Sequence, residues 1–217
     1  GFVCLFLWGI VMSTTPSLLA ADAKPIPQLP KLAALPFPRL AATPAELARL
    51  RAVWTGTGPE REVLAKLVKA ADQARLTPIV FPPRGAQHNQ WYQCEPCQHG
   101  LETVSDTQHR CPLCGKVYSG PPYDDVIFGR QHGLNLRAAA NDIWARAITG
   151  EAQYGEVARA VLLGYAERYL QYPYHDNRQS TGISGGHLNE QTLGEASQMA
   201  GILAPAYDLA VATGVLS

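Results

Sequence analysis

The chain has 217 residues, enough for one or two domains, and 47% of them are hydrophobic while only 17% are charged. This apolar content is sufficient for a buried core, so an intrinsically disordered chain is excluded. The formal net charge is zero and no segment is rich in Lys or Arg, which argues against a dedicated nucleic-acid binder and against a basic membrane-surface patch.

The first 23 residues are typical of a secretory signal peptide. Residues 2–12 are uninterruptedly apolar, which is too short for a bilayer span of about 20 residues. Ala21-Asp22-Ala23 then fits the small-x-small pattern of a cleavage site. We therefore expect a periplasmic or secreted protein with no membrane span after signal removal; a buried core helix is the alternative interpretation. Cys4 lies in this segment, so the mature chain would keep only the cysteines that follow it.

A proline-rich stretch and two helices are predicted next. Residues 24–42 hold five prolines and predict a stiff, extended linker. Thr43 has the pattern of an N-cap for a helix over residues 44–54, with Pro44 at the first helical position and Glu46 at the third. Residues 59–76 predict a second amphipathic helix. Its apolar face is formed by Val63, Leu64, Leu67, Val68 and Ala71.

Between residues 77 and 129 the helical periodicity stops, and an insertion at about residues 90–118 carries two CxxC pairs. Cys94 and Cys97 form the first pair, and Cys111 and Cys114 form the second. Each pair places two thiols on one tight turn, and the 13 residues between the pairs allow a short hairpin that brings the turns together. Four thiolates hold Zn²⁺ tetrahedrally without an open position, which indicates a structural Cys4 zinc ribbon.

Other interpretations of the cysteines remain open. Two disulfides fit the same spacing, and an oxidising compartment permits them. A thioredoxin-like redox role is disfavoured because no βαβ pattern flanks the cysteines. His99 or His109 could replace one ligand, although four cysteines already complete the set. The neutral charge of the chain disfavours a nucleic-acid-reading ribbon.

Helical patterns return after the insertion. Helices are predicted over residues 134–150, 152–172, 187–204 and 206–214, with a kink or break near Pro205. Four tyrosines at helical spacing are expected in the core: Tyr154, Tyr165, Tyr169 and Tyr172. No strand pattern lies outside the insertion and no nucleotide-binding motif is present. The predicted fold class is therefore all-α, made of helical hairpins with one cysteine-bearing insertion.

His187 and Glu190 are the first candidates for chemistry. A helix that started near His187 would project both side chains on one face at its N-terminal end, beside a Gly/Ser-rich loop. A helix N-terminus favours anions such as a substrate carboxylate, and His exchanges protons near neutral pH. The alternative interpretation is a capping arrangement, in which Glu190 bonds the helix start and His187 is merely exposed.

Three stretches of the chain carry a resemblance to a known family. The run from "PPYDDVIFGRQH" to "YPYHDN" (121–177), then "SGGHLNEQT" (184–192) and "APAYDLA" (204–210), resembles the heparinase II/III-like polysaccharide lyases and their alginate-lyase-like relatives. The resemblance covers roughly residues 40–214. It implies that residues 43–217 form an incomplete (α/α) toroid, normally followed by β-sandwich layers, and that the protein cleaves uronic-acid-containing polysaccharides by β-elimination.

The same resemblance implies roles for individual residues. His187 matches the family's base, which removes the C5 proton, and Glu190 would orient His187 or, if protonated, hydrogen-bond the uronate carboxylate. Gly186 stands where many relatives carry Asn, so Asn189 or Asn177 would supply that amide. The family's acid, a Tyr, would follow position 217. We therefore expect the chain to be a piece of a longer protein, inactive alone.

Arg178, in the loop before His187, is a further substrate-binding candidate because an Arg can clamp a carboxylate bidentately, although a loop Arg is more often solvated. The expected partner is an acidic (uronate) polysaccharide or oligosaccharide, and the expected cofactor is structural Zn²⁺. Two other classes remain open: an (α/α)-toroid glycoside hydrolase that uses two carboxylates, and a non-catalytic glycan-binding protein or zinc-ribbon interaction module.

Overall fold

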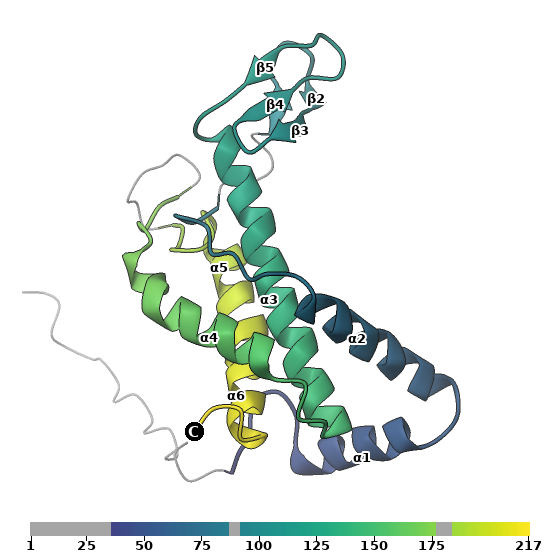
Figure 1. The fold of residues 1–217 in the computed structure, drawn as a ribbon. Coiled ribbons are helices and arrows are strands. Elements are labelled where there is room, and N and C mark those ends of the chain that lie inside the picture. The colour runs from purple at the N-terminus through teal and green to yellow at the C-terminus, as the bar shows by residue number, and fades with distance from the viewer. Residues whose placement is uncertain (1–35, 87–91, 177–183) are drawn as a thin grey trace, which may run out of the picture. The chain divides into compact units, whose positions relative to one another are not determined.

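The computed structural model describes residues 36–86, 92–176 and 184–217, which form mainly helices packed against one another (Figure 1). The predicted signal peptide and the linker up to residue 35 lie outside these ranges. The helices are α1 (Pro44–Thr55), α2 (Pro59–Arg75), α3 (Tyr123–Thr149), α4 (Glu156–Arg168), α5 (Thr192–Gln198) and α6 (Ala204–Ala212). A 3-10 turn (Tyr169–Gln171) extends α4, and a π-helical turn (Met199–Leu203) joins α5 to α6.

Helix α1 begins where the capping signal predicted. The backbone N–H of Glu46 donates to the Thr43 hydroxyl at 3.2 Å, and the backbone N–H of Thr43 donates to the Glu46 carboxylate at 2.7 Å. This reciprocal capping box satisfies two backbone donors at the start of the helix. In α2, Val68 and Ala71 of the predicted apolar face are buried, whereas Val63 is 65% exposed.

Helix α3 is the central helix, and it contacts α1, α2, α4 and α6. It begins at Tyr123, well before the Leu134 start that the apolar periodicity predicted. The first half of α3 buries polar side chains, namely Asp125, His132 and Asn135, and each of them hydrogen-bonds to a group on another segment. A hydrophobic pattern cannot reveal such a face, which is why the predicted start is wrong.

The main core lies where α3, α4 and α6 meet, and the stripe predicted for residues 152–172 contributes to it. Its buried members include Leu136, Ala139, Ile143, Ala147, Ala158, Val161, Tyr165, Leu203, Ala206, Leu209 and Ala210. The predicted irregularity near Pro205 is a π-helical turn, in which the Ala204 N–H bonds to the Met199 carbonyl. The turn allows the chain to pass from α5 into α6 although Pro205 lacks an N–H donor.

Residues 36–42 belong to the same compact unit as the helices rather than to a free linker. The buried carboxylate of Asp208, on α6, accepts hydrogen bonds from the backbone N–H groups of Arg39, Leu40 and Ala41 at 2.8–2.9 Å. A proline-rich segment has few backbone donors, and here one carboxylate satisfies three of them. The last part of the predicted linker is thus fastened to the helical core.

Two small antiparallel sheets make the all-α prediction only partly right. One sheet pairs β1 (Gln93–Cys94) with β2 (His99–Gly100), and the other has the order β3 (Glu102–Ser105), β4 (Gln108–Arg110), β5 (Val117–Tyr118). Within the described residues, all five strands fall inside the predicted insertion, and β4 contacts α3 (Figure 1). Among the same residues, no helix has the length and apolar character that crossing a bilayer requires.

Candidate functional site

His187, Asn189 and Glu190 lie in an irregular segment rather than on a helix. Helix α5 begins only at Thr192, so the prediction of a helix starting near His187 is wrong. The backbone N–H groups of residues 187–189 all donate to the side chain of Glu195, which holds this segment outside the helix. The other predicted substrate contacts, Asn177 and Arg178, lie outside the described residues.

Two glycines bring this segment against its neighbours. Gly186 exchanges two backbone hydrogen bonds with His175, at 3.1 and 3.2 Å, in an isolated antiparallel bridge. Gly185 adopts φ +116°, and a β-carbon there would lie 2.0 Å from the His175 carbonyl oxygen. A β-carbon on Gly186 would lie 2.5 Å from the carboxyl carbon of Glu195. An Asn at position 186, which the resemblance leads one to expect, therefore has no room.

Glu195, in the first turn of α5, organises the segment. Its carboxylate accepts from the backbone N–H groups of His187, Leu188 and Asn189 at 3.1, 3.1 and 2.9 Å. It also accepts from the Tyr169 hydroxyl at 2.6 Å. The residue is only 8% exposed, so these four hydrogen bonds replace the water that its carboxylate gives up.

The His187 ring is held on three sides. Its Nδ1 lies 2.6 Å from the Tyr172 carbonyl oxygen, which can only accept, so Nδ1 carries the proton in this pair. The ring of Tyr169 lies 4.8 Å away between centroids, and that of Tyr174 lies 5.7 Å away in an edge arrangement. In a neutral imidazole with this tautomer, Nε2 carries the lone pair and can accept a proton.

The two other predicted residues of the segment differ in accessibility. Glu190 is only 2% exposed, so its carboxyl group faces the protein interior. Asn189 is partly exposed, and its Oδ1 accepts from the backbone N–H of Gln191 at 2.9 Å. Because that oxygen is engaged, the nitrogen end of the Asn189 amide is the end that a substrate carboxylate could use.

A second segment, residues 84–86, supports the His187 segment. The backbone N–H of Ala86 donates to the Leu188 carbonyl at 2.9 Å, and Nε2 of His175 lies 2.7 Å from the Ala86 carbonyl oxygen. Gly85 is required at its position because a β-carbon there would lie 2.1 Å from the His187 carbonyl oxygen. The two segments are therefore in backbone contact although about a hundred residues separate them in the sequence.

Arg84 brings a positive charge to this region. Its guanidinium pairs with the buried carboxylate of Asp125, while its own side chain stays 41% exposed. A cavity of about 60 Å³ lies among Arg84, Gly85, Asp125, Pro173 and His175, which is too small for a sugar ring.

His132 contacts residues 84–86 from the inside of the protein. Its Nε2 donates to the Arg84 carbonyl at 3.0 Å and its Nδ1 accepts from the Tyr165 hydroxyl at 2.8 Å. Burial lowers the pKa of His132 below its usual value, and the hydrogen bond to Arg84 offsets part of this effect. His132 is thus a neutral internal contact.

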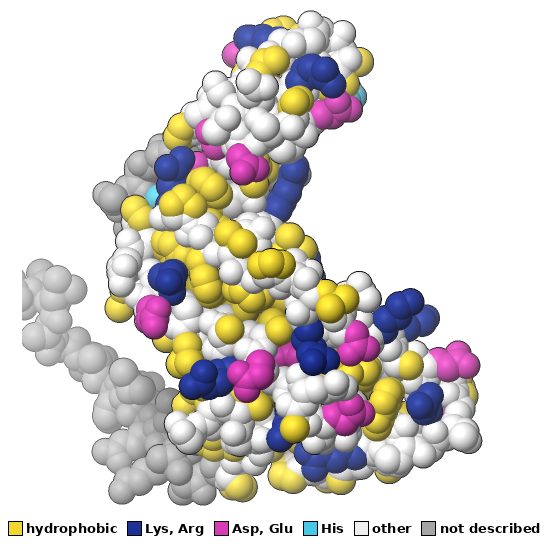
Figure 2. All heavy atoms as spheres, viewed as in Figure 1, with side chains coloured by type: hydrophobic (Ala, Val, Ile, Leu, Met, Phe, Trp, Pro, Cys, Tyr) yellow, Lys and Arg dark blue, Asp and Glu magenta, His cyan; other side chains and the backbone are white. Residues whose placement is uncertain are grey.

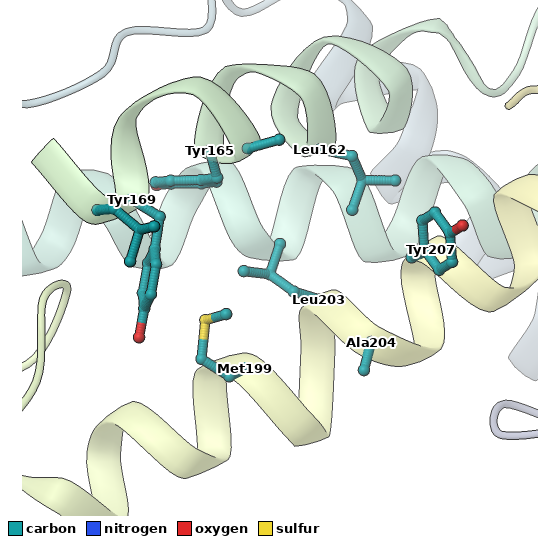
Figure 3. A pocket seen from close by; sticks show the side chains of 9 residues that line it. Leu162, Tyr165, Tyr169, Met199, Leu203, Ala204 and Tyr207 are labelled. Atoms are coloured by element: carbon teal, nitrogen blue, oxygen red, sulfur yellow. The ribbon is translucent and has the colours of Figure 1, made fainter.

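A larger cavity of about 470 Å³ lies between α4 and the segment from the π-helical turn to α6. Figure 2 shows hydrophobic side chains gathered over this part of the molecule, and Figure 3 shows the side chains that line the cavity. They are Leu162, Tyr165, Ala166, Tyr169, Leu170, Met199, Leu203, Ala204 and Tyr207. The only polar side-chain groups among them are tyrosine hydroxyls, which suits apolar matter and not a charged, hydroxyl-rich glycan. We place the candidate site at His187 because of the contacts that orient its imidazole, and not because of a cavity.

The four cysteines of the insertion come together as predicted. Cys94, Cys97, Cys111 and Cys114 are all free thiols, and their sulfur atoms lie within 4.8 Å of one another. A tetrahedral ion with metal–sulfur bonds of about 2.3 Å requires sulfur atoms about 3.8 Å apart. The Cys94–Cys114 sulfur distance is 3.7 Å. This donor set fits a closed, four-coordinate metal site, and the disulfide alternative does not describe this arrangement.

The close approach of the thiols affects their ionisation. The Tyr118 hydroxyl donates to the Cys94 sulfur at 3.3 Å, and this hydrogen bond lowers the pKa of Cys94 to about 6. The neighbouring Cys114 and Cys94 raise the pKa of Cys97 to about 12. The thiolate form of Cys94 is therefore stabilised, whereas ionisation of Cys97 is disfavoured. A divalent cation at the centre would favour the thiolate form of both.

His109 connects the insertion to α3 instead of replacing a cysteine. The side chain is fully buried, with Nδ1 2.7 Å from the Tyr92 hydroxyl and Nε2 2.9 Å from a carboxylate oxygen of Asp124. Asp124 lies in the first turn of α3. His99, the other candidate ligand, is exposed, and its Nδ1 lies 2.9 Å from the Gly100 carbonyl oxygen.

Sequence reasoning missed four residues that surround His187. The helical spacing of Tyr169 and Tyr172 predicts core positions, no pattern singles out Tyr174, and the helical pattern that correctly includes Glu195 does not reveal its contacts. Tyr172 is indeed buried, whereas Tyr169 is only partly buried and contacts the His187 ring. The only sequence signal was the density of tyrosines just before the Gly/Ser-rich loop.

Comparisons with known proteins add no assignment: no protein-family model matches the chain, and a search of the curated proteins finds no similar one. The function must therefore be argued from the residues and from their geometry.

Proposed function

We propose that this chain belongs to an exported polysaccharide lyase that cleaves uronic-acid-containing glycans by β-elimination, on an incomplete (α/α) toroid of the heparinase II/III-like type. The observation that carries the proposal is the His187 imidazole. Its Nδ1 is engaged by the Tyr172 carbonyl at 2.6 Å, which leaves Nε2 as the proton acceptor of a general base. Helix pairs that pack along α3 are consistent with a toroid of hairpins.

The chemistry assigns one task to each group. His187 removes the C5 proton of the uronate, the electron pair forms the C4–C5 double bond, and the bond from C4 to the glycosidic oxygen breaks. The departing oxygen takes a proton from an acid, which is a Tyr in the family that the sequence resembles. Hydrogen bonds or a positive charge at the uronate carboxylate lower the barrier, because negative charge builds up there when the C5 proton leaves.

Several residues are candidates for neutralising that carboxylate. Asn189 can offer the nitrogen end of its amide, and Asn177 and Arg178 remain candidates from the sequence. Arg84, whose half-exposed guanidinium pairs with Asp125, directly precedes Gly85, the residue whose backbone lies against the His187 segment. Glu190 is only 2% exposed. A supporting role for His187 from inside the protein therefore suits it better than direct contact with a glycan.

We further propose that the four cysteines hold a structural Zn²⁺. Four thiolates are a soft donor set that zinc prefers, and a Cys4 site leaves no position for substrate or water. When bound, the ion neutralises the thiolates and fixes the two CxxC turns to each other. The residues of the chain then form a folded insertion that His109 links to α3.

A glycoside hydrolase on the same scaffold is the second candidate, and it needs two carboxylates that flank the scissile bond. The two carboxylates nearest His187 in the sequence do not suit it, since Glu190 is buried and Glu195 is occupied by four hydrogen bonds. A glycan-binding protein without catalysis is the third candidate, and the experiment below separates all three.

The test is an assay of the full-length protein on a panel of uronic-acid polysaccharides. A lyase product absorbs in the ultraviolet because it carries a C4–C5 double bond, whereas a hydrolase yields new reducing ends without that absorbance. We expect absorbance with the wild type and a loss of at least about 100-fold in His187→Ala. His99→Ala, an exposed histidine of the insertion, is the matched control and should keep full activity.

Each other outcome has a defined meaning. Reducing ends without ultraviolet absorbance would favour the hydrolase, and glycan binding without either product would favour the binding protein. Full activity in His187→Ala would reject the assignment of the base. Export is tested separately: the secreted protein should begin at Lys24, after the Ala21-Asp22-Ala23 site, as read by mass spectrometry of its N-terminus.

A further inference from the structure

The carboxylate of Glu195 is surrounded by donors from two separate parts of the chain. Three consecutive backbone N–H groups, at residues 187–189, donate to it. The Tyr169 hydroxyl, from the turn after α4, donates to it at 2.6 Å and shares Oε1 with the His187 N–H. An ionised carboxylate offers only acceptors, so it can take all four donors at once.

Tyr169 acts on His187 in two ways. Its hydroxyl fixes Glu195, which holds the His187 backbone, and its ring lies 4.8 Å from the imidazole between centroids. Burial, followed by the neighbouring Glu195 carboxylate, raises the pKa of Tyr169 above its ordinary value, so the hydroxyl remains a donor. Glu195 and Tyr169 together therefore contact both the backbone and the side chain of His187.

The orientation of the ring depends on this support. The hydrogen bond from Nδ1 to the Tyr172 carbonyl at 2.6 Å requires the His187 backbone to stay in place relative to the turn after α4. Glu195 is the side chain that ties that backbone down, and Tyr169 ties Glu195 to the same turn that carries Tyr172. The arrangement selects the tautomer with a proton on Nδ1 and a lone pair on Nε2.

The geometry points to Glu195 and Tyr169 as positioning residues that lock His187 in the tautomer and orientation of a general base, with neither of them contacting the glycan. This inference rests on the proposed function for its catalytic meaning, although the geometry of His187 can be measured without any substrate. The absence of a β-carbon at Gly186 is part of the same device, because it lets the carboxylate reach the three N–H groups.

The experiment compares Glu195→Gln and Tyr169→Phe with two matched controls. Glu195→Gln keeps the shape but replaces one acceptor oxygen by an NH2 donor, and Tyr169→Phe keeps the ring but removes the hydroxyl. Glu167→Gln changes an exposed glutamate of α4, and Tyr207→Phe changes a tyrosine that is 50% exposed. Thermal unfolding establishes which variants are folded.

The first readout is ¹⁵N NMR of histidine-labelled full-length protein, which distinguishes the two neutral tautomers. We expect the Nδ1–H form at His187 in the wild type and in both controls, and a mixture with the Nε2–H form in Glu195→Gln and Tyr169→Phe. The second readout is uronate elimination. We expect kcat to fall by about 10- to 100-fold in both variants with KM nearly unchanged, because a misplaced base slows the chemical step more than binding.

The inference is overturned if folded Glu195→Gln and Tyr169→Phe both keep the wild-type NMR signature of His187. If Glu195→Gln does not fold, Tyr169→Phe decides alone, because it leaves the carboxylate and the packing of the ring in place. If no uronate is cleaved by the wild type, the proposed function fails, and the NMR comparison still supports or rejects the positioning role.

Discussion

The carboxyl group of Glu195 lies in the space that a side chain on Gly186 would need, with 2.5 Å between its carbon and an ideal β-carbon. The residue before the candidate base must therefore be glycine for as long as Glu195 holds the three N–H groups behind it. A family-like Asn at position 186 and the Glu195 anchor exclude each other in this chain. If the proposed function holds, the amide that the resembled lyase family places before its base comes from elsewhere in this chain, and Asn189 is the candidate among the described residues.

Gly186→Asn should lower both stability and activity, although it introduces the residue that many members of the resembled lyase family carry. The new side chain would displace the carboxylate of Glu195, which four hydrogen bonds hold in place. Overpacking of this kind costs about 1–3 kcal/mol of stability. Urea unfolding monitored by circular dichroism measures the effect. Gly201→Ala, where the nearest atom to an added β-carbon is 3.9 Å away, is the control and should not lower the midpoint. A Gly186→Asn variant as stable and as active as the wild type would contradict the role of this close contact.

Metal analysis should find one Zn²⁺ per chain, and Cys111→Ser should lose it. The cysteine is fully buried in the small core of the insertion, so removing one of four ligands opens the site. His99→Ala is the control and should retain the metal. Chelation should unfold the insertion while most of the helical signal remains, because the main core between the helices is a separate cluster of residues.

Two results would contradict the proposed zinc site. If the protein purified without reductant carries no metal and no free thiols by mass spectrometry, the cysteines form two disulfides and the zinc proposal is wrong. If Cys111→Ser keeps one tightly bound metal, a further ligand completes the site and the four-cysteine set is incomplete as described.

Because His132 is buried, the free energy of unfolding should fall as the pH drops below about 6.5, the ordinary pKa of histidine. Its pKa is lowered in the folded state, chiefly by burial, so the unfolded chain binds a proton first as the pH falls. The contribution of neutral His132 to the free energy of unfolding is therefore fully present above its pKa in the unfolded chain. It is lost as the pH drops through its lower pKa in the folded protein. His132→Gln keeps a donor for the Arg84 carbonyl and an acceptor for the Tyr165 hydroxyl but does not titrate.

Unfolding midpoints measured from about pH 8 down to about pH 5 check that prediction, because this range spans the titration of an ordinary histidine. The wild type should lose more stability over this range than His132→Gln. The exposed His99→Gln serves as the control and should follow the wild type. Parallel curves for all three proteins would show that His132 does not contribute.

Local sequence signals predicted a large part of the fold. The capping box at Thr43 and Glu46 is encoded within four consecutive residues, and Gly150 ends α3 in the left-handed conformation that glycine adopts most readily. The two CxxC pairs are each local as well, so the grouping of four thiols required only that a short hairpin close. Such features depend on neighbours in the sequence, which is why they can be read from it.

The surroundings of the candidate base could not be read in this way. Glu195 is eight residues from His187 and 26 from Tyr169, and its partners are mostly backbone N–H groups, which leave no trace in residue identity. The start of α3 was missed for a related reason, since its buried face uses polar side chains satisfied by distant groups such as Val80. The sequence indicated His187 as a candidate, but only the fold reveals what orients it.

Asp208 should be essential for holding residues 36–42 on the helical core. Its buried carboxylate accepts from the N–H groups of Arg39, Leu40 and Ala41, and in Asp208→Ala these donors lose their acceptor. We expect a loss of about 1–3 kcal/mol in the free energy of unfolding, because hydrogen bonds to a charged group are worth about that much, while donors on exposed residues such as Leu40 can bond to water instead. Asp106→Ala, in an exposed turn of the insertion, is the matched control. Limited trypsin digestion gives a local readout: cleavage after Arg39 should be faster in Asp208→Ala than in the wild type, and equal rates would show that the proline-rich segment is held by other contacts.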